Sequence, residues 1–389
     1  MLSPQPPART FRLAHLFTLL LMSILLLLNG CSMSTSTTSQ ASAADFVFVS
    51  NSGSGTVSAF AMSSTGSLSP ISTPFPAGAG AEFLAFDSVH KLLFVSNQQA
   101  NTVSVFSVNT STGTLAAVSG SPFATGARPI GVAVDAMGRF VFVANQADSS
   151  ISAFSIGTNG LLSPVPGSPF VVGNPYGLAV NPAGTVLFAN NFPDSMVSDL
   201  NTVSAFQIGA NGALSAVPGS PFATASSVGF ASSIGLTVDP TGKFLFVADH
   251  MAQAVVPFSI ASTGALTSVT ALPTSAPSCS VSCHNNPLRL VVHPNDRFVY
   301  ATNVQAGTVT AFSIANGALS PIGDVATGAH PFGVALDPSG GFLFVVNKVD
   351  NSISAYTVNS STGMVTPISG SPFSGNLNAP TDIVVIAKQ

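Results

Sequence analysis

Six side chains suited to acid–base chemistry or to anion binding stand near the beginnings of apolar runs that are spread through the chain. They are Glu82, Arg128, Tyr176, Arg289, His330 and Asp382. Glu82 or His330 could position or deprotonate a water molecule, and arginines could hold a carboxylate, a phosphate or a developing oxyanion. We therefore take Glu82 and His330 as catalytic candidates and the other four as ligand-binding candidates.

These six residues are notable because charge is scarce in this chain. Only 6% of its residues are Asp, Glu, Lys or Arg, and Glu82 is its single glutamate. Three roles are open for the six side chains. They could solvate a channel and pair with one another, bind a ligand without chemistry, or catalyse a reaction. Each role requires a fold that brings positions 82 to 382 together.

A phrase that occurs seven times predicts that fold. It is an apolar run closed by a polar residue, usually Asn, and its copies start 46, 48, 46, 58, 54 and 44 residues apart. The copies occupy residues 46–51, 92–97, 140–145, 186–191, 244–249, 298–303 and 342–347. Strand-like runs without a helical period, repeated at this distance, are typical of β-propellers. The sequence predicts an all-β protein with a seven-bladed β-propeller over residues 44–389.

One repeat, residues 126–170, indicates how a blade is built. It holds four extended runs, at residues 130–135, 140–145, 151–156 and 162–170. The second run is apolar on both faces, so neighbouring sheets must cover both sides. The fourth contains three prolines, which cannot donate to a central ladder, and is therefore the outer edge strand. We predict blades of four antiparallel strands.

The two ends of the repeat region complement each other. The first copy begins with a second strand and lacks an inner one, whereas residues 380–386 match the inner-strand pattern of residues 129–135. We predict that this C-terminal segment pairs with residues 46–51. The pairing would close the ring and remove its open edges.

The two faces of the predicted ring differ in their connections. Turns from first to second and from third to fourth strands are short, whereas the other connections hold every long insertion. Variable loops on a rigid scaffold commonly carry binding sites. The inner strands begin on the same face, so we expect the six candidate side chains to surround the mouth of an axial channel there.

The N-terminal residues have the pattern of an export signal. Two arginines precede an apolar run from Leu16 to Leu28, which is shorter than a membrane-spanning helix. The sequence LNGC that ends at Cys31 resembles the lipobox of bacterial lipoproteins, in which the cysteine is lipidated; an ordinary signal peptide is the alternative. We expect a signal peptide at residues 1–30, lipid on Cys31 and a Ser/Thr-rich tether at residues 31–43. The protein would then be exported and lipid-anchored in the cell envelope, in the periplasm or at the outer membrane.

Two further cysteines, Cys279 and Cys283, lie four residues apart in a predicted loop. In an oxidising compartment they would most simply form a disulfide. Free thiols and a metal site with His284 are the alternatives, although a structural zinc site lacks an obvious fourth ligand. We expect no metal and no cofactor.

Charge also limits the class of partner. Removal of the signal peptide would leave eight basic against 14 acidic residues, without a basic cluster. Nucleic acid is therefore not expected as a partner. We expect a monomer that binds a small molecule or an envelope protein, with the membrane reached through the lipid alone.

The repeats resemble two related groups. FVYATN and FVFVAN, together with the runs TVSAF and SISAF, are similar to YVTN-type propeller repeats and to the seven-bladed lactonase family, which includes bacterial 6-phosphogluconolactonase and fungal carboxymuconate cyclase. The resemblance covers nearly all of residues 44–389. It implies an inner strand that starts with a His-Pro-His type sequence, near Arg and Glu. His330 and Pro331 match its first part, and Phe332 stands where the second histidine would be.

Two functions follow from these observations. The first is an exported propeller that binds a small acidic or carbohydrate-type ligand, or a protein, at the channel mouth. The second, implied by the resemblance, is a lactonase or a cycloisomerase that hydrolyses or forms a lactone.

Overall fold

Each of the seven apolar phrases is a β-strand, and each lies second from the centre in one of seven antiparallel sheets. The computed structural model describes residue 1 and residues 45–192, 201–224, 233–250, 253–269, 272–273 and 286–389. Cys31, Cys279 and Cys283 lie outside these residues, as do residues 2–30 of the predicted signal peptide and the whole predicted tether. In the described part of the chain, no helix is long and apolar enough to cross a membrane.

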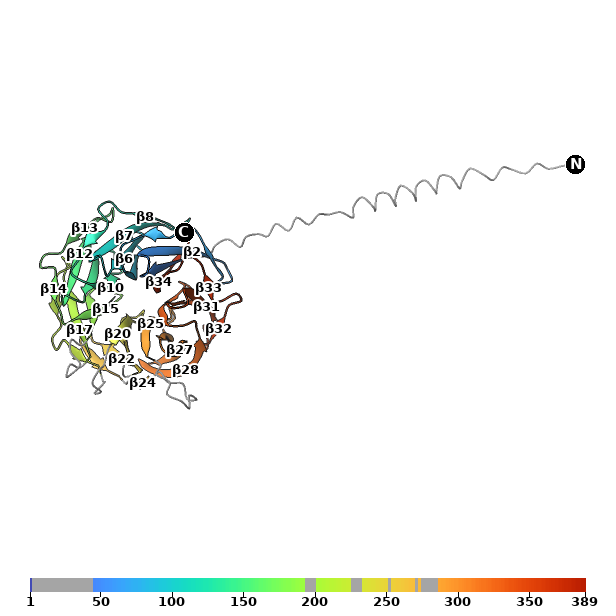
Figure 1. The fold of residues 1–389 in the computed structure, drawn as a ribbon. Helices are drawn as coiled ribbons and strands as arrows, with labels where there is room; N and C mark the ends of the chain where they lie inside the picture. Colours follow the sequence, from blue (N-terminus) through green and yellow to red (C-terminus); the bar gives the residue numbers. More distant parts are fainter. Residues whose placement is uncertain (2–44, 193–200, 225–232, 251–252, 270–271, 274–285) are drawn as a thin grey trace. The chain divides into compact units, whose positions relative to one another are not determined.

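Seven inner strands surround the axis of the ring, and each contacts the next (Figure 1). In chain order from blade 2 to blade 7, and then blade 1, they are β5 (Ala81–Asp87), β10 (Pro129–Val134), β15 (Pro175–Val180), β20 (Ser233–Val238), β25 (Pro287–Val292), β29 (Pro331–Leu336) and β34 (Pro380–Ala387). This order confirms the predicted seven-bladed β-propeller.

The second and third strands form the body of each blade. From blade 1 to blade 7 the second strands are β1 (Asp45–Asn51), β6 (Leu92–Asn97), β11 (Phe140–Asn145), β16 (Val186–Asn191), β21 (Phe244–Asp249), β26 (Phe298–Asn303) and β30 (Phe342–Asn347). The third strands are β2 (Thr56–Met62), β7 (Thr102–Asn109), β12 (Ser150–Ile156), β17 (Thr202–Ile208), β22 (Ala254–Ile260), β27 (Thr308–Ala315) and β31 (Ser352–Val358).

The outer strand departs from the prediction of one continuous fourth strand. In six blades it is broken into two short strands that both pair with the third strand. These are β3 (Leu68–Pro70) and β4 (Phe75–Pro76), β8 (Thr114–Ala117) and β9 (Phe123–Ala124), β13 (Leu162–Pro164) and β14 (Phe170–Val171), β18 (Leu214–Ala216) and β19 (Phe222–Ala223), β23 (Leu266–Ser268) and β24 (Leu272–Pro273), and β32 (Val365–Pro367) and β33 (Phe373–Ser374). Among the residues that the structure describes, an unbroken outer strand occurs in blade 6, where it is β28 (Ala318–Ala326).

A Gly-Ser-Pro-Phe sequence explains the break in several blades. In blade 3 the Ser168 hydroxyl accepts a hydrogen bond of 2.9 Å from the backbone N–H of Ala153 in β12. Equivalent serines serve blades 2, 4 and 7. The hydroxyl thus replaces the strand partner that is lost where the chain turns at Pro169, so the buried third strand keeps its hydrogen bonds.

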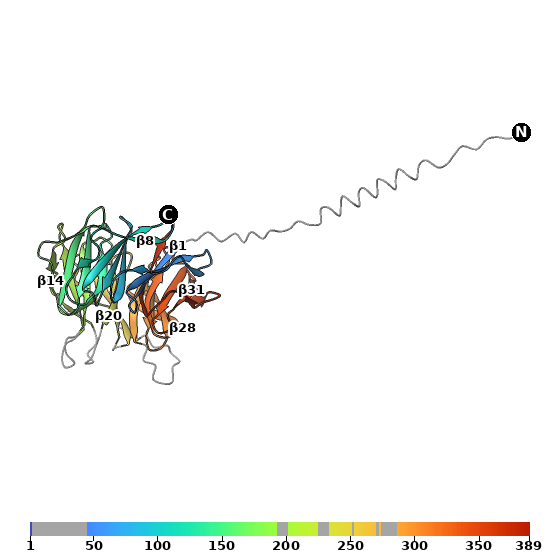
Figure 2. The ribbon, with the colours of Figure 1, turned by 45° about the horizontal axis from the view of Figure 1, so that its top comes forward.

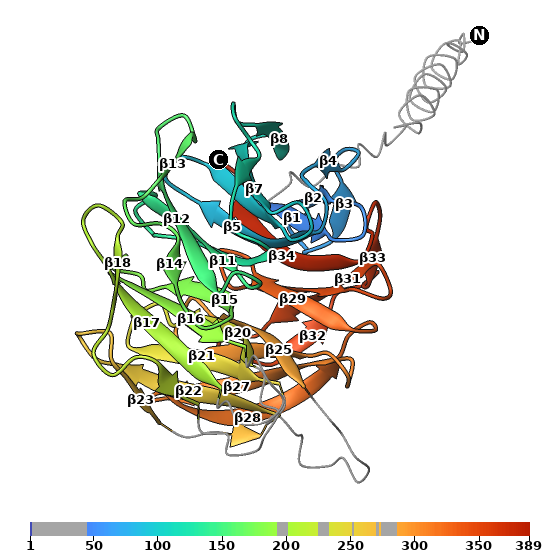
Figure 3. The same cartoon turned by 60° about the vertical axis from the view of Figure 1, so that its left-hand side comes forward.

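The C-terminal strand closes the ring as predicted. β34 pairs antiparallel with β1, with Phe46 opposite Ile386 and Val49 opposite Ile383. Figure 3 shows β34 beside β1 although the two strands come from opposite ends of the propeller sequence. The last residue is also held, because the Gln389 N–H donates to the Thr110 carbonyl of blade 2; Figure 2 shows the C-terminus near β8.

The hydrophobic core lies between the blades. Phe48 of blade 1 packs with Val95 of blade 2, while Phe94, on the other face of that strand, packs with Val143 of blade 3. All four side chains are fully buried. This is why the second strands are apolar on both faces.

The Asn that closes the phrase fastens the second strand to the third. In six blades its side-chain amide donates to a Ser or Thr hydroxyl of the third strand, at 2.7–2.9 Å. The acceptor lies seven residues later in five of these blades and thirteen residues later in blade 4, where Asn191 donates to Ser204. Blade 5 carries Asp249 instead, and the residue seven positions on is Val256. There the carboxylate accepts a hydrogen bond from Asn201. The phrase usually ends in Asn because a side-chain N–H donor at this point bonds the hydroxyl of the third strand.

Candidate functional site

The inner strands begin with an irregular segment that aims side chains at the axis. In blades 2, 3, 4, 6 and 7 the first residue pairs with the end of the second strand, and pairing resumes only three residues later. The two residues between them lie outside the regular register. Bulges of this kind redirect side chains at the rim of a sheet.

The six candidate residues occupy three successive positions of this segment. Arg128 and His330 directly precede the inner strand, Glu82 and Tyr176 are its second residue, and Arg289 and Asp382 are its third. All six residues thus lie at the starts of inner strands, but their positions are not equivalent to one another.

Arg289 links three blades across the middle of the ring. Its guanidinium is 2.9 Å from the Asp382 carboxylate of blade 1 and lies 3.7 Å from the centre of the Phe83 ring of blade 2. The same carboxylate oxygen of Asp382 also accepts a hydrogen bond of 3.0 Å from the backbone N–H of Leu84. The Arg289 side chain is 16% exposed. Asp382 thus holds the Arg289 guanidinium in place. It can orient the arginine as well as contact a ligand.

An aromatic row extends from this arginine. The Tyr176 ring meets Phe83 edge-on at 5.9 Å and stacks on Phe192 at 6.1 Å. Burial raises the pKa of Tyr176 to about 12, and the nearby Glu82 charge adds to the rise. The phenol therefore stays neutral at physiological pH, which suits binding rather than proton abstraction.

Glu82 is the acid–base candidate with the strongest geometric support. Its side chain is buried, with 5% of the residue exposed, and makes no hydrogen bond or ion pair with the described residues. Burial raises the pKa of this carboxyl, whereas the positive charges of Lys348, Arg289 and Arg128 act in the opposite direction. A carboxylate with a raised pKa and free oxygens can accept a proton from water.

Lys348 is a site residue that the sequence analysis missed. It directly follows the Asn that ends β30, and its amine lies 4.6 Å from the centre of the Phe332 ring. Among the charged groups around Glu82, it is the strongest that lowers the pKa of that carboxyl. Its position in the repeat could have revealed it, because the residue after the closing Asn lies beside the start of the inner strand of the same blade.

Arg128 and His330 have a shared backbone role. Both adopt left-handed backbone conformations, with φ of 53° and 54°, at the corner before a proline. Asn174 and Asn286 stand at the same corner in blades 4 and 6, also with positive φ. The Arg128 and His330 carbonyls accept hydrogen bonds from Gln146 and Lys348. Both side chains are exposed, and His330 is not among the groups that influence Glu82.

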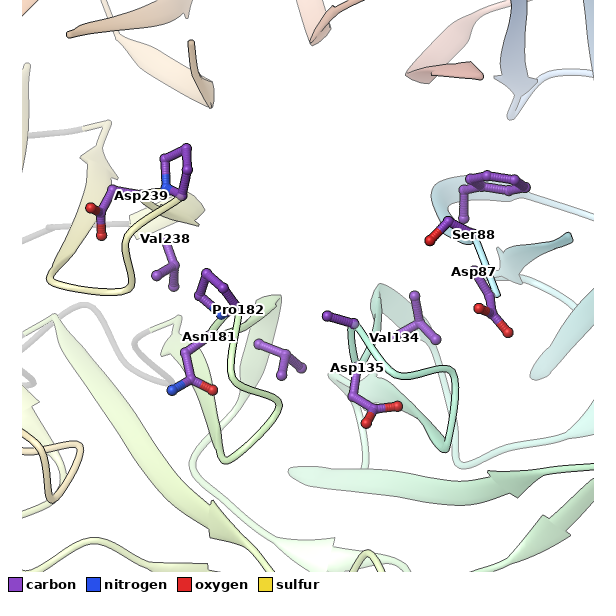
Figure 4. Close-up of a pocket in the computed structure, with 12 residues that line it drawn as sticks. Asp87, Ser88, Val134, Asp135, Asn181, Pro182, Val238 and Asp239 are labelled. Atoms are coloured by element: carbon purple, nitrogen blue, oxygen red, sulfur yellow. The ribbon is translucent and has the colours of Figure 1, made fainter. Parts of the chain in front are cut away.

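A hollow of about 180 Å³ lies at the other end of the inner strands (Figure 4). Its aspartates are already engaged. Asp135 accepts hydrogen bonds from Arg139 and Phe140, and Asp239 accepts hydrogen bonds from Thr241 and Phe244, all within their own turns. The labelled Val134, Val238 and Pro182 also line the hollow. It therefore offers apolar surface rather than free acid–base groups.

In the described ranges, no group of three or more His, Cys, Asp or Glu side chains is arranged to hold a metal ion. Cys279 and Cys283 lie outside those ranges, so the predicted disulfide stays a prediction.

The family comparison concerns most of the propeller. The model described as a lactonase, seven-bladed β-propeller, matches residues 33–126 and 236–379. These stretches contain Glu82, Arg289 and His330, whereas Arg128, Tyr176 and Asp382 lie outside them. A 6-phosphogluconolactonase from Formosa agariphila is 40% identical over 77 residues, or 18% of this chain. The chain spans only 22% of the length of that curated relative.

Solved structures share the whole ring. A candidate 6-phosphogluconolactonase from Bacteroides uniformis has a TM-score of 0.74 at 20% identity, with 88% of this chain and 100% of that chain covered. A periplasmic gluconolactonase from Pseudomonas aeruginosa has a TM-score of 0.73 at 18% identity, with 89% and 99% covered. A protein of unknown function from Desulfotomaculum acetoxidans has a TM-score of 0.69 at 17% identity, with 89% and 100% covered. At these identities the likeness concerns the fold.

Proposed function

Because the chain belongs to the seven-bladed β-propeller lactonase family, we propose that it hydrolyses a lactone at the mouth formed by the starts of the inner strands. The observation that supports this proposal is the buried Glu82 carboxylate, which makes no hydrogen bond to a described residue and lies among the charges of Lys348, Arg289 and Arg128. The family match favours lactone hydrolysis over ligand binding without chemistry.

Glu82 and Arg289 take the chemical roles in this proposal. The Glu82 carboxylate accepts a proton from water while the water oxygen bonds to the lactone carbonyl carbon. The Arg289 guanidinium, held by Asp382 and Phe83, stabilises the oxyanion that forms. The ring C–O bond then breaks, and the departing alkoxide takes the proton from Glu82. The product is a hydroxy acid.

The two other cations are suited to substrate binding. Lys348 and Arg128 form no ion pair with a described carboxylate, whereas Arg289 is paired with Asp382. An acidic substituent on the lactone would find its partners in Lys348 and Arg128 rather than in Arg289. Tyr176 and Phe192 add a flat apolar surface against which a sugar ring can lie.

Lactone turnover tests this proposal. Protein without residues 1–31 is offered gluconolactone, 6-phosphogluconolactone and uncharged five- and six-membered lactones, and acid release is followed. Glu82→Gln is expected to lower kcat/KM by roughly 10²- to 10⁴-fold. Asp45→Asn, a carboxylate change at the far end of β1, serves as the control. Full activity in Glu82→Gln would exclude the assigned base. A wild-type protein that opens none of these lactones would contradict the proposed reaction and favour ligand binding alone.

We also propose that the protein is exported and anchored through lipid on Cys31, on the basis of the lipobox-like sequence. Fractionation of cells that express the full chain tests this location. Wild type should be found with membranes and Cys31→Ser should not. Equal distribution of the two proteins would disprove lipid anchoring.

A further inference from the structure

Three buried hydroxyls stand behind the side chains that meet at the ring axis. Ser50, Ser96 and Thr302 occupy the same position, the fifth residue of the phrase, in blades 1, 2 and 6. All three are fully buried. These are the blades whose inner strands supply Asp382, Phe83 and Arg289.

Each hydroxyl makes the same two hydrogen bonds. It accepts from the backbone N–H of the third inner-strand residue in its own blade, namely Asp382 at 3.0 Å, Phe83 at 3.1 Å and Arg289 at 3.2 Å. It donates to an inner-strand carbonyl of the next blade, namely Glu82 at 2.6 Å, Ile130 at 2.6 Å and Phe332 at 2.8 Å. The hydroxyl therefore bridges two neighbouring inner strands at the bulge.

Blades 3, 5 and 7 meet the next blade differently. They have apolar residues at the hydroxyl position, Ala144, Ala248 and Val346, and glycine at the third inner-strand position. A β-carbon on Gly131 would collide with the Tyr176 carbonyl oxygen, and one on Gly333 would lie 2.8 Å from Asp382 Cα. In these blades the backbone of the next inner strand lies where a side chain at the third position would have to be. Blade 4 combines glycine with Asn190, whose amide oxygen accepts from the Gly177 N–H at 2.7 Å.

We propose that Ser50, Ser96 and Thr302 are positioning residues that hold the Arg289–Asp382–Phe83 cluster in its reactive geometry. The hydroxyl bridge joins two inner strands without close backbone approach, so the third residue is free to carry a side chain toward the axis. Ser50 also holds the Glu82 carbonyl, and Thr381 donates to it at 2.8 Å. The proposal rests on the proposed lactone hydrolysis for its catalytic meaning.

The test compares variants of two buried threonines in blade 6. Thr302→Val removes the bridging hydroxyl at nearly constant volume, and Thr302→Ser retains it. Thr310→Val is the matched control, because Thr310 is equally buried but accepts from Asn303 between the second and third strands. Ser96→Ala is a second variant that removes a bridging hydroxyl. Alanine already occupies the equivalent position in blades 3 and 5.

We expect Thr302→Val to lower kcat/KM on the order of 10- to 100-fold, mainly through kcat, because a displaced guanidinium no longer meets the oxyanion. Thr302→Ser should stay within about twofold of wild type. Thr310→Val should lose stability without losing kcat. Equal kcat in Thr302→Val and Thr310→Val overturns the proposal.

Crystal structures separate this inference from the reaction. In Thr302→Val, Arg289 and Asp382 should lie beyond ion-pair distance, whether or not any lactone is a substrate. An ion pair unchanged at 2.9 Å in both Thr302→Val and Ser96→Ala overturns the positioning role. A wild-type protein without lactone turnover but with a displaced Arg289 in the variants overturns the reaction alone.

Discussion

At the scale of single residues, the charge of Lys348 influences the ionisation of the Glu82 carboxyl. Burial raises the pKa of the Glu82 carboxyl, and Lys348 is the largest of the opposing influences. A general base must be ionised to act, so the acid limb of kcat/KM follows the pKa of Glu82 in the free protein. The limb is therefore expected above the ordinary glutamate range.

Lys348→Met should move this acid limb to higher pH. Loss of the positive charge removes an interaction that favours the ionised carboxylate, so the pKa of Glu82 rises further and more of the protein is inactive at a given acidic pH. The limb is measured from kcat/KM with an uncharged lactone, which removes the separate effect of Lys348 on acidic substrates. A fall in kcat/KM of roughly tenfold at the acidic end, with recovery at high pH, is expected.

Lys388→Met is the matched control, since Lys388 is exposed and follows the end of β34 opposite to Asp382. It should leave the limb unchanged. A limb that moves to lower pH in Lys348→Met, or one that shifts equally in both variants, contradicts the assignment of Glu82 as the base.

Single-residue chemistry was only partly predictable from the sequence. The candidates near Glu82 could be found because each stands near the start of an inner strand, a position that the repeat pattern reveals. The pairing of Arg289 with Asp382 could not be found in this way, since the two residues come from blades 6 and 1 and meet only across the ring axis. Lys348 was missed because it belongs to the end of a second strand, where the repeats place mostly neutral residues.

At the scale of elements, the inner-strand glycines set how closely the blades approach. A β-carbon on Gly131 would collide with the backbone carbonyl of Tyr176, and backbone atoms cannot move aside as a flexible side chain can. Gly131→Ala should therefore lower the free energy of unfolding by about 1–3 kcal/mol, the usual cost of overpacking. Because the added methyl group would displace Tyr176, a residue of the candidate site, lactone turnover should fall as well.

Gly173→Ala provides the comparison for this prediction. No atom lies within 4 Å of the β-carbon that would be added there. Chemical denaturation of both variants measures the difference. Equal stability of Gly131→Ala and wild type would show that the inner strands have more freedom than the close approach implies.

The second strands were predictable to the residue in six blades, and to within one residue in β1, because two independent signals agree. Their apolar character on both faces marks the buried stretch, and the closing Asn marks its end. The outer strands were not predictable as single elements. Residues 162–170 have the composition of one edge strand, yet the Ser168 hydroxyl takes over a backbone hydrogen bond and permits two short strands, β13 and β14.

At the scale of the whole propeller, ring closure depends on one strand. Residues at the two ends of the repeat region match because they complete one blade, which is why the pairing of β34 with β1 could be predicted from the sequence. Ile383 and Ile386 of β34 are each 3% exposed and pack into the cores on either side of blade 1. Each such side chain contributes about 1.5–3 kcal/mol through burial.

Deletion of residues 380–389 should therefore cost far more stability than its length suggests. It removes the inner strand of blade 1, exposes the edge of β1 and leaves the Arg289 guanidinium without Asp382. We expect the truncated protein to unfold about 10 °C or more below wild type in thermal denaturation, or to aggregate. Deletion of residues 388–389 alone should have a small effect, since the strand itself remains.

Addition of the missing strand as a peptide distinguishes ring closure from a general loss of surface. A peptide of residues 379–389 can pair with the open edge of β1 through the same backbone hydrogen bonds, as strand addition does elsewhere. It should restore the melting temperature of the truncated protein and, with Asp382 returned to Arg289, its lactone turnover. The same peptide with aspartate at positions 383 and 386 should restore neither, because its charges would have to enter the cores between the blades. If the truncated protein melts like wild type without any peptide, the ring does not depend on this closure.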